Sequence, residues 1–127
     1  STHTLGSSDN NFPIVPGEGY FVRSLWPGTA SIPGIVPEFS SMSIARGHSI
    51  ISFPKTPAGL TNAEAVLQAM KNPSDPEKSV DVRTITRWFG GRYVVHGIDS
   101  DANNFSITPG QGYFIRNFGE AKTFNLP

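Results

Sequence analysis

Residues 3–24 read HTLGSSDNNFPIVPGEGYFVRS, and residues 96–117 read HGIDSDANNFSITPGQGYFIRN. The two stretches align without a gap at an offset of 96 − 3 = 93 residues, and 12 of their 22 positions are identical. An internal repeat of this strength is not a chance match, so the rest of the chain is interpreted around it.

The repeat leaves two interpretations of the domain organisation open. Since 127 − 93 = 34, the chain holds one full period and 34 residues of an earlier one. It is either cut from a longer array, with the first tail completing the fold of the unit after it, or it is one domain that uses two copies of a hairpin in pseudo-symmetric positions. Because 34 residues alone bury too little apolar surface for a core, we expect a single cooperative module spanning residues 1–127.

Each copy predicts a β-hairpin. Residues 12–15 and 105–108 alternate in the manner of short strands. The Pro-Gly that follows suits a type II turn, because proline presets one φ and glycine accepts the positive one. The Tyr-Phe-Val/Ile-Arg after each turn predicts the second strand, with one ring of each Tyr-Phe pair directed inward and one outward.

A second hairpin is predicted at residues 84–96, TITRWFGGRYVVH. A two-residue Gly-Gly loop suits a type I′ or II′ turn. Pairing across this loop sets Phe89 opposite Arg92, Trp88 opposite Tyr93, and Thr86 opposite Val95.

The remaining elements complete a mainly β fold. Residues 47–54 predict a strand, and residues 62–71 a helix with Thr61 as its cap and Glu64 completing a capping box. Residues 72–79 predict a loop. We therefore expect an antiparallel β-sandwich or an open barrel with one short helix at about residues 62–71.

The composition excludes several classes of function. Ten basic and ten acidic side chains cancel, so no field would attract nucleic acid or an anionic membrane, and neither is expected as a partner. The chain has no cysteine, which excludes thiolate metal sites and a cysteine nucleophile. No apolar run approaches the roughly 20 residues of a membrane span. A low charged fraction of 16% with many turn-forming residues suits an extracellular domain whose leader is already removed or belongs to a larger parent protein.

The aromatic residues are the candidate ligand-binding residues. Trp88 and Tyr93 share one face of the Gly-Gly hairpin, and the other face carries three potential cations. They belong either to the core or to an exposed surface on which sugar rings stack. Trp26 lies in a predicted loop, where it either binds ligand or covers a local gap. The candidate ligand-binding set is Trp88, Tyr93, Arg92, Trp26 and Phe89.

Metal binding and catalysis have less support. Asp99, Asp101 and Asn103 place oxygen atoms at alternate positions, as a calcium loop does, but the glycine and glutamate that such a loop needs are absent. We expect this stretch to form a turn and no cofactor to bind, with calcium as the alternative. The three histidines are isolated in sequence and no catalytic motif occurs, so we expect no enzyme.

Much of the chain resembles modules of secreted bacterial multidomain proteins. The resemblance rests on the pattern Gly47-x-x-Ile50-Ile51-Ser52-x-Pro54, the short helix, Trp88 with its Gly-Gly hairpin, and residues 109–114 (PGQGYF). In those proteins such units adjoin glycoside hydrolases or surface proteins. The resemblance covers most of residues 39–127. It implies a carbohydrate-binding accessory module, and it assigns no binding residue.

The expected function is non-catalytic binding of a plant cell-wall polysaccharide, such as β-glucan or xyloglucan, by a secreted module tethered to a catalytic or surface domain. The alternative is a structural or adhesive repeat domain of a bacterial cell-surface protein. Exposure of Trp26 or Trp88 favours the first, and their full burial favours the second. A hydrolase would need paired carboxylates in a cleft, which no spacing in the sequence indicates.

Overall fold

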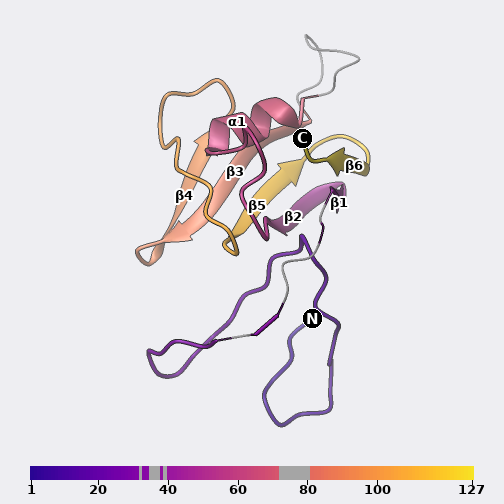
Figure 1. The fold of residues 1–127 in the computed structure, drawn as a ribbon, viewed down its shortest axis with the longest axis vertical. Coiled ribbons are helices and arrows are strands. Elements are labelled where there is room, and N and C mark those ends of the chain that lie inside the picture. Colours follow the sequence, from indigo (N-terminus) through magenta and orange to yellow (C-terminus); the bar gives the residue numbers. More distant parts are fainter. Residues whose placement is uncertain (32, 35–37, 39, 72–80) are drawn as a thin grey trace.

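The protein is mainly β with one short helix, as the sequence predicts (Figure 1). The computed structural model describes residues 1–31, 33, 34, 38, 40–71 and 81–127, so the loop predicted at 72–79 lies outside the described residues. Its elements in chain order are β1 (Ser41–Ile44), β2 (Gly47–Ser52), α1 (Ala63–Ala69), β3 (Val82–Phe89), β4 (Arg92–Gly97), β5 (Gly112–Asn117) and β6 (Lys122–Asn125).

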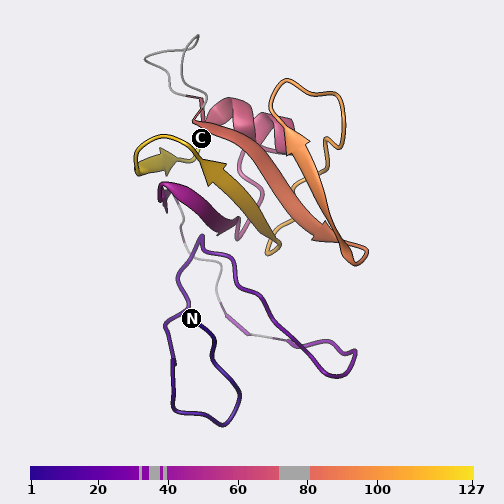
Figure 2. The ribbon, with the colours of Figure 1, turned by 180° about the vertical axis from the view of Figure 1, so that it is seen from behind.

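Within the described part of the chain, the strands form two antiparallel sheets and no closed barrel (Figure 2). The larger sheet has the order β2-β5-β3-β4, and β1 pairs with β6 in the smaller one. The buried side chain of Asn117 joins the two sheets, because its amide donates to the carbonyls of Ala45 and Glu120 and its oxygen accepts from the Gly119 N–H. Neither β1 nor β6 was predicted from the sequence.

The Gly-Gly hairpin forms in the predicted register. Phe89 pairs with Arg92, Trp88 with Tyr93, and Thr86 with Val95. Gly90 and Gly91 both have positive φ, as a type I′ turn requires.

The helix is found where the sequence places it, but its predicted cap is wrong. Asn62, not Thr61, is the N-cap, and its side chain accepts a hydrogen bond from the Ala65 N–H at 2.9 Å. Glu64 does not close a capping box, because its carboxylate turns toward His96 and the Asp99 N–H instead. A tertiary partner has therefore replaced the local one.

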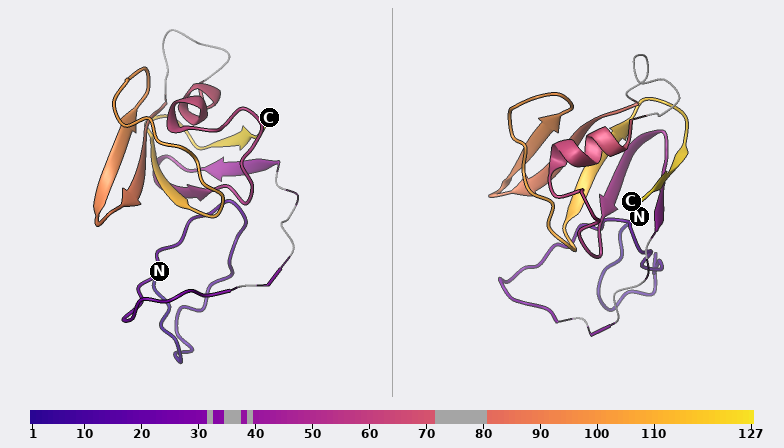
Figure 3. Two further views of the ribbon diagram at one scale, coloured as in Figure 1. Left: turned by 60° about the vertical axis from the view of Figure 1, so that its left-hand side comes forward. Right: turned by 45° about the horizontal axis from the view of Figure 1, so that its top comes forward.

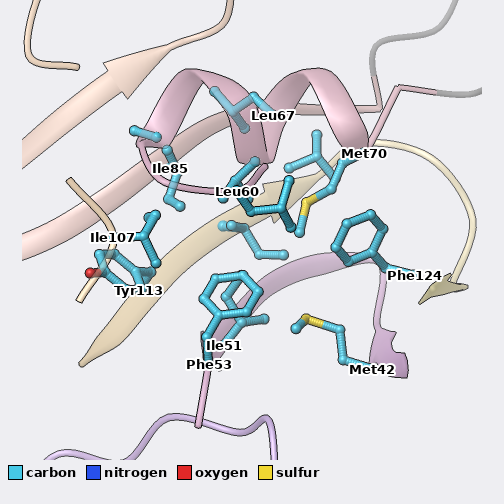
Figure 4. Packing of buried hydrophobic residues seen from close by; sticks show 14 of the residues in the cluster. Met42, Ile51, Phe53, Leu60, Leu67, Met70, Ile85, Ile107, Tyr113 and Phe124 are labelled. Atoms are coloured by element: carbon cyan, nitrogen blue, oxygen red, sulfur yellow. The ribbon is translucent and has the colours of Figure 1, made fainter. Parts of the chain in front are cut away.

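The core lies between α1 and one face of the four-stranded sheet (Figures 3 and 4). Ala63, Val66 and Leu67 of the helix are buried against Ile85 of β3. The other buried apolar side chains come mainly from the strands and the loop before β5: Met42, Ile44, Ile51, Phe53, Leu60, Met70, Val82, Phe105, Ile107, Tyr113, Ile115 and Phe124.

The hairpin predicted in each repeat copy is not formed. Residues 12–15 and 105–108 are not strands, apart from one bridge between Ser106 and Asn62. The Pro-Gly turn does form in both copies, closed by Glu18 N–H to Val15 C=O and by Gln111 N–H to Thr108 C=O. Past the turn only the second copy becomes a strand, β5, because β2 and β3 flank it.

Candidate binding surface

The four-stranded sheet has one face away from α1, which we call the open face. Strand alternation sends Ile85, Tyr113 and Ile115 into the core, so their neighbours point the other way. The open face therefore carries Ile50, Ser52, Thr84, Thr86, Trp88, Tyr93, Val95 and Phe114, together with the paired His48 and Arg116.

Four aromatic rings form a continuous cluster on the open face, which we call the aromatic cluster. Trp88 and Tyr93 meet edge to face with centroids 4.7 Å apart, and Tyr93 meets Phe114 edge to face at 5.7 Å. Phe21, from the N-terminal segment, packs on Phe114 at 5.1 Å. Edge-to-face pairs of this kind hold the rings in fixed orientations.

Trp88 and Tyr93 are not core residues, which excludes one of the two interpretations of the hairpin. Their side chains are 49% and 56% exposed. The opposite face, which carries the potential cations, is the one that packs beneath α1, and His96 on that face is fully buried. The interpretation that cations mark the solvent face is thus wrong.

Specific partners make burial of the polar face possible. The Arg87 guanidinium lies 4.6 Å from the centroid of the Phe105 ring and 4.7 Å from that of Phe89, so it stacks between two aromatic faces. His96 Nε2 lies 2.7 Å from a carboxylate oxygen of Glu64, and Nδ1 lies 2.8 Å from the Ala102 carbonyl oxygen.

His96 is isolated in the sequence, but in the structure it pairs with Glu64. Burial raises the pKa of Glu64, but the hydrogen bonds from Gln68, His96 and the Asp99 N–H, with the charge of His96, outweigh it and hold that pKa below its ordinary value. Because both ring nitrogens of His96 are occupied and the ring is enclosed, the pair ties α1 to β4, and His96 has no free ring nitrogen to present to a substrate.

The structure brings together only part of the predicted ligand-binding set. Trp88 and Tyr93 lie in the aromatic cluster. Phe89 and Arg92 form a register pair at the tip of the same hairpin, on its other face. Trp26 is 81% exposed in the N-terminal segment, and it makes none of the ring contacts described for the cluster.

Sequence reasoning left Phe114 out of the site, although the signal was present. The expected alternation of each Tyr-Phe pair is confirmed in the second copy, where Tyr113 is buried and Phe114 is half-buried on the open face. Combining that alternation with the pairing of β5 to β3 would have placed Phe114 beside the Trp88–Tyr93 pair.

A shallow cleft of about 170 Å³ lies in the aromatic cluster, lined by Tyr20, Phe21, Ile50, Trp88, Gln111, Gly112 and Phe114. A larger cavity of about 710 Å³ lies between the N-terminal turn and the β1–β6 sheet. Its lining residues are small, aliphatic or charged and include no aromatic ring. We place the candidate surface at the cleft, because rings and polar side chains meet there.

Residues 99–103, for which calcium binding was the alternative to a turn, are held by contacts with other protein groups. The Asp99 carboxylate accepts from Gln68 and lies 3.7 Å from the Lys71 ammonium, and the Asn103 amide donates to the Val95 carbonyl. Asp99 and Asn103 both have positive φ. These contacts support the turn role expected for the stretch. Within the described residues, no three His, Asp or Glu side chains lie together as a metal site would require.

Comparison of the chain with protein-family models, with curated proteins and with solved structures found no match. In the part of the chain that the structure describes, no helix has the length and apolar character needed to cross a bilayer.

Proposed function

We propose that the protein is a non-catalytic module that binds a neutral polysaccharide of the β-glucan or xyloglucan class on its open face. The exposure of Trp88 and Tyr93 carries this proposal. Half of each ring is left in water although a core lies on the other side of the same sheet. Single exposed apolar residues are common on protein surfaces, but several large exposed rings that contact one another form a contiguous apolar patch. Such patches mark binding surfaces.

The shape of the surface favours a polymer over a small molecule. The cleft of about 170 Å³ is smaller than the roughly 300 Å³ or more of enclosed small-molecule pockets. Sugar rings present apolar C–H faces and hydroxyl edges. The cluster offers ring faces, and Thr86 and Gln111 beside it offer hydrogen-bonding groups.

The charge balance favours a neutral glycan. Basic and acidic residues are equal in number, so no net charge would concentrate an anionic polymer at the surface. A few stacking contacts suffice for a secreted module tethered to a catalytic or surface domain, because tethering raises its effective concentration on the polymer. We propose that role and an extracellular location.

Affinity electrophoresis in gels containing β-glucan, xyloglucan, xylan or mannan tests the proposal. The chain should be retarded by a β-glucan or xyloglucan, and Trp88→Ala should lower the affinity about tenfold, which corresponds to about 1.4 kcal/mol. Phe89→Ala is the matched control, because Phe89 is the next residue of the same hairpin but lies on its other face. Trp26→Ala tests the separate exposed ring.

Unaltered mobility with all four glycans would refute polysaccharide binding. Equal loss in Trp88→Ala and Phe89→Ala would place binding at the hairpin tip instead of the open face. A structural or adhesive repeat domain is the second candidate function. Its support is the duplicated segment at residues 3–24, in which Ile14 and Val22 stay exposed although their counterparts in the second copy are buried.

A further inference from the structure

As far as the tyrosine, residues 3–20 and 96–113, the two repeat copies make the same local contacts. In each, the tyrosine hydroxyl accepts from a backbone N–H five residues earlier at 2.8 Å, and the same ring stacks on a phenylalanine eight residues earlier. The agreement extends to the histidine ring bonded to a carbonyl six residues on, and to the asparagines with φ near 55°. As far as Tyr20, the first copy is therefore already folded locally as the second one is.

The surroundings of the two copies are opposite. Ile107 is 6% exposed, whereas its counterpart Ile14 is 72% exposed. Ile115 in β5 is 1% exposed, whereas its counterpart Val22 is 89% exposed. The first copy carries the same inward-facing apolar side chains as β5 and its preceding loop, but the sheet and helix that cover them are absent around it.

From this mismatch we propose that residues 3–24 form the β5 strand and preceding loop of another module of the same fold. The covering partner is a segment equivalent to residues 40–95, which supplies β1, β2, α1, β3 and most of β4. The protein is thus built as a tandem array of such modules. This proposal does not depend on the ligand of the open face: it places Phe21, the counterpart of Phe114, on the open face of the other module, and the Trp88–Tyr93–Phe114 contacts remain in this one.

The sequence of the first copy fits the position it would occupy. In the second copy the Phe105 carbonyl accepts from the Ala63 N–H at the start of α1, and the Ile107 N–H donates to the Thr61 carbonyl. The N–H of Ser106, which lies between them, points away from this bridge. Pro13 is the counterpart of Ser106 in the first copy. A proline has no N–H, so at this position it would remove no hydrogen bond from the bridge. His3 likewise matches His96, and it would meet the equivalent of Glu64 in the covering segment.

The equivalence ends after Ser24. Gly119 is the counterpart of Trp26, and a Cβ at Gly119 would lie 2.5 Å from the Asp81 carboxylate carbon. A tryptophan does not fit that position unless the residue facing it also changes. The proposed strand therefore comprises residues 19–24, and Trp26 belongs to the connection that follows.

An extended chain tests the proposal: a duplicate of residues 40–95 fused directly before residue 3, with residues 3–127 otherwise intact. We expect backbone amides of residues 20–24 to exchange at least about 100-fold more slowly in the extended chain than in the 127-residue chain. We also expect two cooperative units in calorimetry. Unchanged exchange at residues 20–24 would overturn the proposal, whether or not the added segment folds.

Val22→Asp and Ile115→Asp are the matched variants. In the 127-residue chain Ile115→Asp should abolish cooperative unfolding, and Val22→Asp should leave the midpoint within about 2 °C, since Val22 is exposed there. In the extended chain Val22→Asp should abolish the slow exchange of residues 20–24 and leave that of β5 unchanged. Slow exchange that survives Val22→Asp would show that the strand is not buried as β5 is, and would also overturn the proposal.

Discussion

At the residue scale, the largest single-site effect outside the apolar core is expected at Glu64. Glu64→Ala leaves His96 Nε2 without a partner inside a closed site and removes the acceptor of the Asp99 N–H. Loss of a charge-assisted hydrogen bond to an enclosed group should lower the free energy of unfolding by about 2–3 kcal/mol. Glu120→Ala is the control, because its ion pair with Arg46 is exposed, and it should cost under about 0.5 kcal/mol in urea unfolding.

The same carboxylate predicts an acid-sensitive contribution to stability. The pKa of Glu64 is lower in the folded protein than its ordinary value of 4.5, so folding favours its ionised form. Its contribution is therefore complete above about pH 4.5 and is lost as the pH falls through the lower, folded pKa. The difference in unfolding free energy between the native chain and Glu64→Gln should be larger at pH 7 than at pH 3. A difference that stays constant over this range would contradict the assignment.

At the scale of elements, the tyrosine that closes each Pro-Gly turn should matter in one copy only. The Tyr113 hydroxyl accepts from the Thr108 N–H inside the folded module, so Tyr113→Phe should cost about 1 kcal/mol. Tyr20→Phe removes the same bond to Val15 where water can replace it, and should cost close to nothing. Urea unfolding of the two variants provides the comparison, and equal costs would mean that both turns are equally enclosed.

The elements also show how far sequence reasoning reaches. The register of β3 and β4 was predictable, because a two-residue glycine turn fixes it locally. Which face of that hairpin is buried was not, because the partners of Arg87 and His96 come from Phe105 and Glu64, distant in sequence. β1 and β6 are four residues each and pair with one another across most of the chain, so neither has a local pattern that identifies it.

For the whole molecule, the N-terminal segment is attached to the folded module by a short backbone pairing with β2 and by the packing of Phe21 on Phe114. The Gly19 N–H donates to the Ile50 carbonyl, and the Ser52 N–H donates to the Gly17 carbonyl. Residues 17–19 therefore pair alongside β2 at the outer edge of the four-stranded sheet. A Cβ at Gly19 would lie 2.1 Å from Ile50 Cγ2, so the backbone approaches more closely than any other residue allows. Beyond this contact, residues 21–31 are exposed throughout.

Gly19→Val should therefore release the segment without unfolding the module. The core is built from residues 40–71 and 81–127, so the midpoint of thermal unfolding should change by less than about 3 °C. The Ser52 amide, freed from the Gly17 carbonyl, should exchange about tenfold faster, since opening of this contact governs its exchange rate. Gly28→Val is the control, because a Cβ there meets no atom within 4 Å. Unchanged exchange of the Ser52 amide in Gly19→Val would mean that the close approach at Ile50 does not hold the segment. Loss of the cooperative transition would mean that the segment is an integral part of the module.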